Sequence, residues 1–160
     1  ITRPKQKDLP AQRINLDIAM LPSYQRQPMM LKNSYFLEAG ISGLILQAES
    51  LEEILADKLI AFACRQNRDL WDIFWLSRKN IVPDKELIKQ KLSDRKIRHE
   101  DFSIKYNSRL EEIKVGQKDF VYEMRRFLPP SAFDSVFMSE NWWNYLYVLL
   151  KDFAKTCGLQ

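Results

Sequence analysis

Apolar and polar residues alternate near the start of the chain, between residues 13 and 19. One face carries Ile14, Leu16 and Ile18. Asp17 lies on the opposite face, and this period of two residues is typical of a half-buried strand. A short apolar run at residues 44–46, after Gly43, predicts a second strand. Proline and serine residues between the two strands predict a loop at residues 22–28.

The clearest helix signal follows Ser50. Ser50 and Glu53 are spaced as a capping box, in which the Ser side chain accepts a backbone hydrogen bond and the Glu side chain reaches back. A helix should therefore begin at Leu51 and continue through Cys64, with apolar residues recurring every three or four positions. This stripe consists of Leu51, Leu55, Leu59 and Phe62.

The rest of the chain is helical in pattern. A helix at residues 68–78 is so rich in large apolar side chains that most of its circumference must be covered, which should make it central to the fold. Further helical segments are predicted at residues 84–92, at residues 102–128 with possible breaks, and at residues 131–157. Two prolines separate the last two segments, and Gly158 fits a helix stop. These patterns predict an α+β fold that is mainly α.

Two side-chain groups in the helical part can each be interpreted in two ways. Lys and Arg concentrate between Lys85 and Arg98, with His99 next, and such a run is more often a solvated helix face than a binding surface. Near the end stands an aromatic group: Trp142, Trp143, Tyr145 and Tyr147. We favour the core of the last helix over a base-stacking platform for this group. His99 is expected to be exposed.

The composition is that of an ordinary folded protein. Of 160 residues, 46% are hydrophobic and 29% charged, which excludes a disordered or collagen-like chain. The net charge of +4 favours RNA or nucleotide phosphates without establishing either. No apolar run approaches the roughly 18 residues that span a bilayer, and the first residues do not resemble a signal peptide. We therefore expect a cytoplasmic protein with Cys64 and Cys157 both reduced.

The candidates for chemistry are charged residues on apolar elements, because a single His and only 4 Gly exclude His-rich zinc sites and a glycine-rich phosphate loop. Asp17 is either an exposed strand residue or a carboxylate beside a cleft, of the kind that metal-dependent phosphoryl transfer uses. Lys58 lies on or beside the buried stripe of its helix, where it must reach solvent or meet an anion. Asp72, between Trp71 and Ile73, needs a partner.

Helical spacing can bring more charges to the same place. Arg65 and Asp69 are four residues apart, and Asp69 and Asp72 are three apart. Together with Arg68, they can cluster along one helical side. A structural ion pair between two helices and a group that acts on a substrate explain this spacing equally well. In either case Asp72 could hold Lys58 or an arginine, or orient a reacting hydroxyl.

Three segments in a fixed order carry a family resemblance. They are Ile14-Asn-Leu-Asp17-Ile, Ser50-Leu-Glu-Glu-Ile-Leu-Ala-Asp-Lys-Leu, and Arg65 followed by Arg68-Asp-Leu-Trp-Asp72-Ile. In order and spacing they resemble the nucleotidyltransferase toxin family of AbiEii/AbiGii type, over about residues 13–76. The resemblance implies that residues 1–49 are a remnant of a polymerase-β-like nucleotidyltransferase sheet, with about two strands, and that residues 50–160 are a helical bundle domain.

The resemblance also implies roles and partners. Lys58, Arg65 and Arg68 would bind a nucleoside triphosphate, and Asp17 would hold Mg²⁺. Asp72 and Asp69 would be the catalytic acids. Some members of the family are toxins that attach nucleotides to tRNA or another target. An antitoxin protein and tRNA or another RNA are therefore expected partners, and a membrane is not.

One departure from the family pattern concerns catalysis. The family's Gly-Ser turn and metal-holding Asp-x-Asp pair have no counterpart before Asp17. Phosphoryl transfer depends on positioning and charge neutralisation, so we expect this chain alone to be inactive. The alternative is a non-catalytic helical module that binds an antitoxin or RNA through the surface from Lys85 to Arg98.

Overall fold

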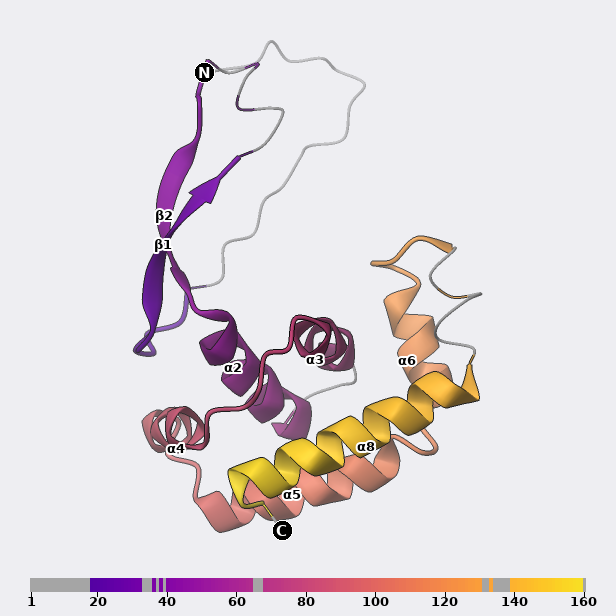
Figure 1. The fold of residues 1–160 in the computed structure, drawn as a ribbon. Coiled ribbons are helices and arrows are strands. Elements are labelled where there is room, and N and C mark those ends of the chain that lie inside the picture. The colour runs from indigo at the N-terminus through magenta and orange to yellow at the C-terminus, as the bar shows by residue number, and fades with distance from the viewer. Residues whose placement is uncertain are drawn as a thin grey trace, which may run out of the picture.

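A computed structural model of the chain describes residues 18–32, 36, 38, 40–64, 68–130, 133 and 139–159. Two strands precede a set of helices (Figure 1). The elements are β1 (Arg26–Leu31), β2 (Leu44–Glu49), α2 (Leu51–Cys64), α3 (Asp69–Arg78), α4 (Lys85–Asp94), α5 (His99–Glu112), α6 (Gln117–Met124) and α8 (Glu140–Cys157). The predicted α+β, mainly α fold class is confirmed. Within the described ranges, no helix has the length and apolar character that crossing a membrane requires.

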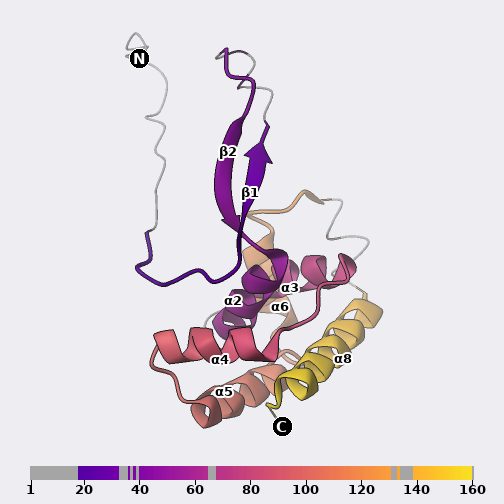
Figure 2. The ribbon, with the colours of Figure 1, turned by 60° about the vertical axis from the view of Figure 1, so that its left-hand side comes forward.

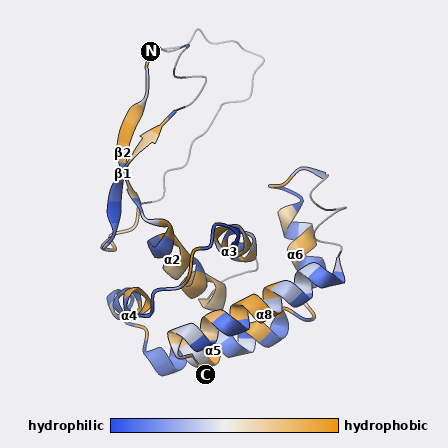
Figure 3. Cartoon of the chain, in the orientation of Figure 1, coloured by the Kyte–Doolittle hydropathy of each residue, from blue (hydrophilic) through white to orange (hydrophobic). Residues whose placement is uncertain are grey.

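The two strands form an antiparallel hairpin that stands away from the helices in both views (Figures 1 and 2). Arg26 pairs with Glu49 at the base of the hairpin, and Leu31 pairs with Leu44 at the far end. The hairpin is coloured hydrophobic toward that far end in Figure 3, and the apolar side chains there are exposed. They are Met29, Met30, Leu31, Leu44, Ile45 and Leu46. The described helices therefore cover neither face of the hairpin.

The strand predictions are partly wrong. The strand predicted at residues 44–46 exists and extends to Glu49. The loop predicted at residues 22–28 is wrong from Arg26 onward, because β1 includes Pro28. Proline is tolerated on an edge strand, where its missing N–H need not serve a neighbour. Of the strand predicted at 13–19, residues 13–17 lie outside the described residues, and Ile18 and Ala19 are exposed and outside any strand.

The start of α2 joins the hairpin to the helices. Ser50 Oγ accepts a hydrogen bond from the Glu53 N–H at 3.1 Å, and the helix begins at Leu51 as predicted. The second half of the capping box is wrong. The Ser50 N–H donates to Gln25 O at 2.7 Å, while the Glu53 carboxylate accepts from the Tyr24 and Gln25 N–H groups. The residues that precede β1 are thus hydrogen-bonded to the start of α2.

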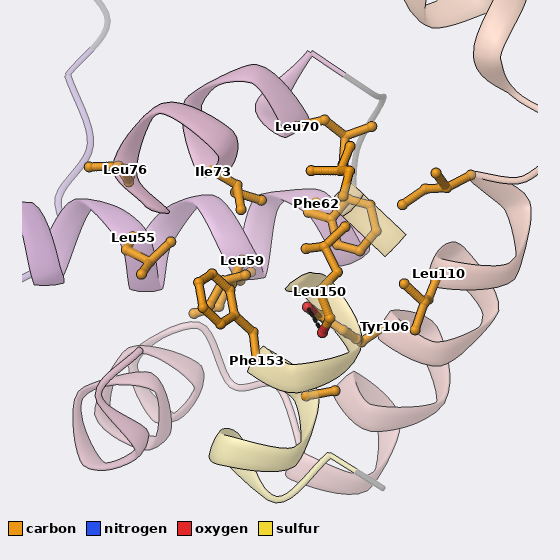
Figure 4. Close-up of a cluster of buried hydrophobic side chains, with 14 of the residues drawn as sticks. Leu55, Leu59, Phe62, Leu70, Ile73, Leu76, Tyr106, Leu110, Leu150 and Phe153 are labelled. Carbon is orange, nitrogen blue, oxygen red and sulfur yellow. Dashed lines mark hydrogen bonds between the residues drawn. The ribbon is translucent and has the colours of Figure 1, made fainter. Parts of the chain in front are cut away.

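The core surrounds α2, which contacts α3, α4 and α5, while α8 contacts α4 and α5. Figure 4 shows side chains from α2, α3, α5 and α8 meeting at its centre. Its labelled residues are Leu55, Leu59, Phe62, Leu70, Ile73, Leu76, Tyr106, Leu110, Leu150 and Phe153. Aromatic rings extend the core, with Phe74 of α3 packed edge-on against Trp142 of α8. The predicted core role of the last helix is therefore confirmed for Trp142 and Trp143, which are buried, whereas Tyr145 is exposed.

The helix predictions are confirmed in part. Most of the circumference of α3 is at least partly covered, as predicted, because Trp71 and Phe74 also pack against the core, while Trp75 is exposed. The segment predicted at 102–128 does contain a break, because it is two helices, α5 and α6, separated by a turn at residues 113–115. The last helix begins at Glu140. His99 is half-buried rather than exposed. Cys64 and Cys157 are both free, in agreement with the predicted reduced state.

The Asp84 side chain caps α4, because it accepts hydrogen bonds from the Glu86 and Leu87 N–H groups at 2.9 and 3.1 Å. We expect Asp84→Ala to lower the free energy of unfolding by about 1 kcal/mol, measured by urea denaturation. Glu86→Ala is the control, since the exposed Glu86 side chain pairs with Lys89 on the same helix. Equal stability of the Asp84→Ala variant and the unmodified chain would contradict a capping role.

Candidate functional site

Lys58 occupies the centre of a small ionic cluster between α2 and α3. Its Nζ lies 3.1 Å from Asp69 Oδ1 and 2.5 Å from Asp72 Oδ2. The two acids are three residues apart, so one side of α3 presents both toward α2. The predicted meeting of Lys58 with anions and the predicted need of Asp72 for a partner are both confirmed. The catalytic and nucleotide-binding roles of these residues stay predictions.

The surroundings of Lys58 keep it charged. Burial by itself would lower the pKa of the Lys58 ammonium group, but hydrogen bonds and charges from Asp72 and Asp69 outweigh burial and raise the pKa above its ordinary value. The two acids differ in access to solvent, with side-chain exposures of 4% for Asp69 and 44% for Asp72. Asp69 is therefore suited to holding the lysine, and Asp72 remains reachable from outside.

A cavity of about 320 Å³ adjoins Lys58. Its charged lining residues are Asp57, Lys58, Arg68, Asp69 and Arg95. Its remaining walls are Ile60, Ala61, Cys64 and Ile97. The predicted residues Lys58, Arg68 and Asp69 thus share one cavity, whereas Arg95 was predicted only as part of the basic run. Arg65 and Asp17 lie outside the described residues.

A second cluster surrounds Lys91 of α4, which is only 2% exposed. Its Nζ lies 2.9 Å from Glu53 Oε1, 2.7 Å from Asp57 Oδ2 and 3.8 Å from Glu49 Oε1. Arg95 Nη2 donates to the other Asp57 oxygen at 2.6 Å. The interpretation of residues 85–98 as a solvated face is therefore wrong for Lys91 and Arg95, both of which turn inward.

The Lys91 cluster fixes the base of the hairpin. Burial would raise the pKa of Glu53, but hydrogen bonds from Lys91 and from the Gln25 and Tyr24 N–H groups lower that pKa to about 2. Lys91 stays charged, because hydrogen bonds to Asp57 and Glu53 outweigh the effect of burial and raise its pKa. One carboxylate thereby ties the chain before β1 to α2 and α4.

A signal for Lys91 was present in the sequence. The buried positions of α4 are Leu87, Ile88, Lys91 and Leu92. Lys91 therefore lies on the apolar stripe of its helix at the same three- and four-residue spacing that singled out Lys58. Because basic residues surround Lys91 in the sequence, it was interpreted as part of a solvated charge run rather than as a buried position.

Comparison with protein families identifies a family for most of the chain. The family described as nucleotidyl transferase AbiEii toxin, Type IV TA system, matches residues 1–139. The chain belongs to the AbiEii family. The match extends well beyond the segments at residues 13–76 that carry the sequence resemblance, into the helices that surround α2. Comparisons with curated proteins and with solved structures gave no match.

Membership of the AbiEii family supports two of the expectations. The family is described as a nucleotidyl transferase toxin of a Type IV toxin-antitoxin system, which indicates a nucleotidyltransferase-like protein with an antitoxin partner. An RNA partner, the nucleotide and the acceptor remain predictions.

A metal ion in a protein is held by several Asp, Glu, His or Cys side chains that converge on one point. No three Asp, Glu, His or Cys side chains in the described part of this AbiEii chain converge as metal ligands. The acids gather around lysine ammonium groups instead, as Asp69 and Asp72 do around Lys58. These residues alone do not fit Mg²⁺, and the predicted magnesium site still depends on Asp17.

Proposed function

We propose that this AbiEii chain takes part in nucleotide transfer from a nucleoside triphosphate to an RNA or protein acceptor, and that Lys58 contacts the triphosphate. The supporting observation is the Lys58 cluster. A charged, partly exposed ammonium group is held by two acids at the edge of a cavity that also contains Arg68. Phosphate groups are bound by cations fixed in this way.

The proposal gives each residue a role that suits its surroundings. Asp69, almost fully buried, orients the Lys58 ammonium group. Asp72, at 44% exposure, can accept a hydrogen bond from the acceptor hydroxyl whose oxygen attacks the nucleotide phosphorus as pyrophosphate leaves. Arg68 and, by position, Arg65 support the phosphates. Magnesium, with Asp17 among its ligands, would supply neutralisation of phosphate charge when bound.

The non-catalytic alternative is less well supported by the structure. It requires the basic residues between Lys85 and Arg98 to form a binding surface. Lys91 is buried in its own cluster, and Arg95 is paired with Asp57. The surface that would bind an antitoxin or RNA therefore loses two of its cations.

We expect Lys58→Met to weaken the binding of a fluorescent nucleoside triphosphate about tenfold or more, measured by fluorescence anisotropy with Mg²⁺ present. Methionine keeps an unbranched stem in place of lysine and removes the charge. Lys89→Met is the matched control, because Lys89 is an exposed lysine that pairs with Glu86 on its own helix. Circular dichroism establishes that each variant is folded. Unchanged affinity in a folded Lys58→Met variant would show that the cluster is only a structural ion pair.

A further inference from the structure

The cavity beside Lys58 is formed by three separate parts of the chain. α2 contributes Asp57 and Lys58, the start of α3 contributes Arg68 and Asp69, and the segment after α4 contributes Arg95 and Ile97. Arg95 is far from Lys58 in sequence, so only the packing of α4 against α2 brings the two cations to one cavity. The lining thus includes three cations and two carboxylates, and Asp72, which also pairs with Lys58, is not part of that lining.

The cations differ in how firmly they are held. Lys58 is paired with two acids. Arg68 is exposed and makes no ion pair with any residue in the described ranges. Arg95 donates from Nη2 to Asp57 at 2.6 Å and from Nη1 to Lys91 O at 3.0 Å.

Asp57 does not depend on Arg95 alone. Its second oxygen lies 2.7 Å from Lys91 Nζ, and Lys91 is fixed in place by burial. Asp57 therefore keeps a cationic partner if the Arg95 guanidinium turns toward another anion. This arrangement makes Arg95 available to a ligand without leaving a carboxylate unpaired.

The size and walls of the cavity suit phosphate groups rather than a whole nucleotide. Its volume of about 320 Å³ is at the low end for ligand sites. The planar guanidinium groups of Arg68 and Arg95 match the geometry of phosphate oxygens. Ile60, Ala61 and Ile97 make part of the lining apolar, and a charge interaction is stronger beside apolar walls than in bulk water.

We propose that this cavity is a polyphosphate subsite in which Arg95 is a phosphate-binding residue. The phosphate chain extends from Lys58 to a position between Arg68 and Arg95. The assignment rests on the proposed function, because it treats the phosphates as those of the nucleoside triphosphate. It adds to that function Arg95, which follows α4 and lies outside the segments at residues 13–76 that carry the sequence resemblance.

The test is isothermal titration of the chain with inorganic triphosphate. We expect Arg95→Ala to weaken binding about tenfold, and Arg95→Lys to weaken it less, because lysine keeps the charge and loses the planar fork. Arg98→Ala is the matched control and should bind normally, since Arg98 is 75% exposed and pairs with Asp101. Asp57→Asn should strengthen binding by releasing Arg95, and this gain should disappear when Arg95→Ala is combined with it.

The outcomes separate the two proposals. Normal binding by a folded Arg95→Ala variant, with weakened binding by Lys58→Met, overturns the role of Arg95 and leaves the proposed function in place. Weakened binding by Arg95→Ala with normal binding by Lys58→Met supports phosphate binding by Arg95. The same result overturns the function assigned to Lys58 and the extension of the phosphate chain to Lys58. An unmodified chain that binds no triphosphate overturns both. If Arg95→Ala does not fold, Arg95→Lys and Asp57→Asn decide the question in its place.

Discussion

Replacing Lys91 with alanine is expected to lower the free energy of unfolding by about 3–5 kcal/mol, because it leaves buried carboxylates without their cation. Lys91 is 2% exposed and Glu53 is fully buried. Asp57 retains Arg95, so Glu53 bears most of the loss. Urea denaturation followed by circular dichroism measures the effect. Lys89→Ala, on the same helix, should change stability by less than about 0.5 kcal/mol.

The loss in the Lys91→Ala variant should depend on pH. The pKa of Glu53 in the folded chain is about 2, below its ordinary value of 4.5. A carboxylate with a lowered pKa stabilises the fold above the ordinary value, and this contribution is lost as the pH falls toward the folded pKa. Without Lys91, the folded pKa of Glu53 should rise. The stability difference between the unmodified chain and the variant should therefore be large at neutral pH and smaller near pH 3. A difference of the same size at both pH values would contradict the ionic explanation.

Tyr106→Ala is expected to lower the free energy of unfolding by about 3–5 kcal/mol through the cavity it leaves in the core. Tyr106 is fully buried, and its ring packs edge-on against Phe62 at 5.3 Å and Phe102 at 5.9 Å. Its hydroxyl donates to Leu150 O at 3.0 Å, the dashed line in Figure 4. Urea denaturation again gives the measurement.

Two controls separate the contributions of the Tyr106 ring and hydroxyl. Tyr106→Phe keeps the ring and removes one hydrogen bond, so it should cost about 1 kcal/mol. Tyr122→Ala removes a tyrosine that is 78% exposed and should change stability by less than about 0.5 kcal/mol. If Tyr106→Phe lowers the free energy of unfolding as much as Tyr106→Ala, the hydrogen bond accounts for the effect and the packing explanation is contradicted.

Contacts between residues that are close in sequence were predicted correctly. The start of α2 at Leu51 follows from Ser50, one residue away. The meeting of Lys58 with Asp69 and Asp72 follows from helical periodicity in two neighbouring helices. Both signals lie within a short stretch of chain, where geometry leaves few alternatives.

The contacts that escaped prediction join distant segments. Glu53 was expected to complete its own helix cap, but the backbone of Tyr24 and Gln25 uses its carboxylate instead. Lys91 meets Asp57 across 34 positions of sequence. No periodic pattern within one helix reveals which helix will pack against it. β1 was missed because Pro28 is a turn signal in most settings and is acceptable in this strand only because of its place in the hairpin.

Asp57 belongs to two clusters at once, since Arg95 holds one of its oxygens at the cavity and Lys91 holds the other at the base of the hairpin. An anion that draws Arg95 away leaves Asp57 wholly to Lys91. By thermodynamic linkage this effect is mutual. If a bound anion changes the equilibrium constant for the contact that holds the hairpin by some factor, then forming that contact changes the affinity for the anion by the same factor. Through the shared Asp57 carboxylate, the contact at the base of the hairpin and anion binding in the cavity therefore affect each other.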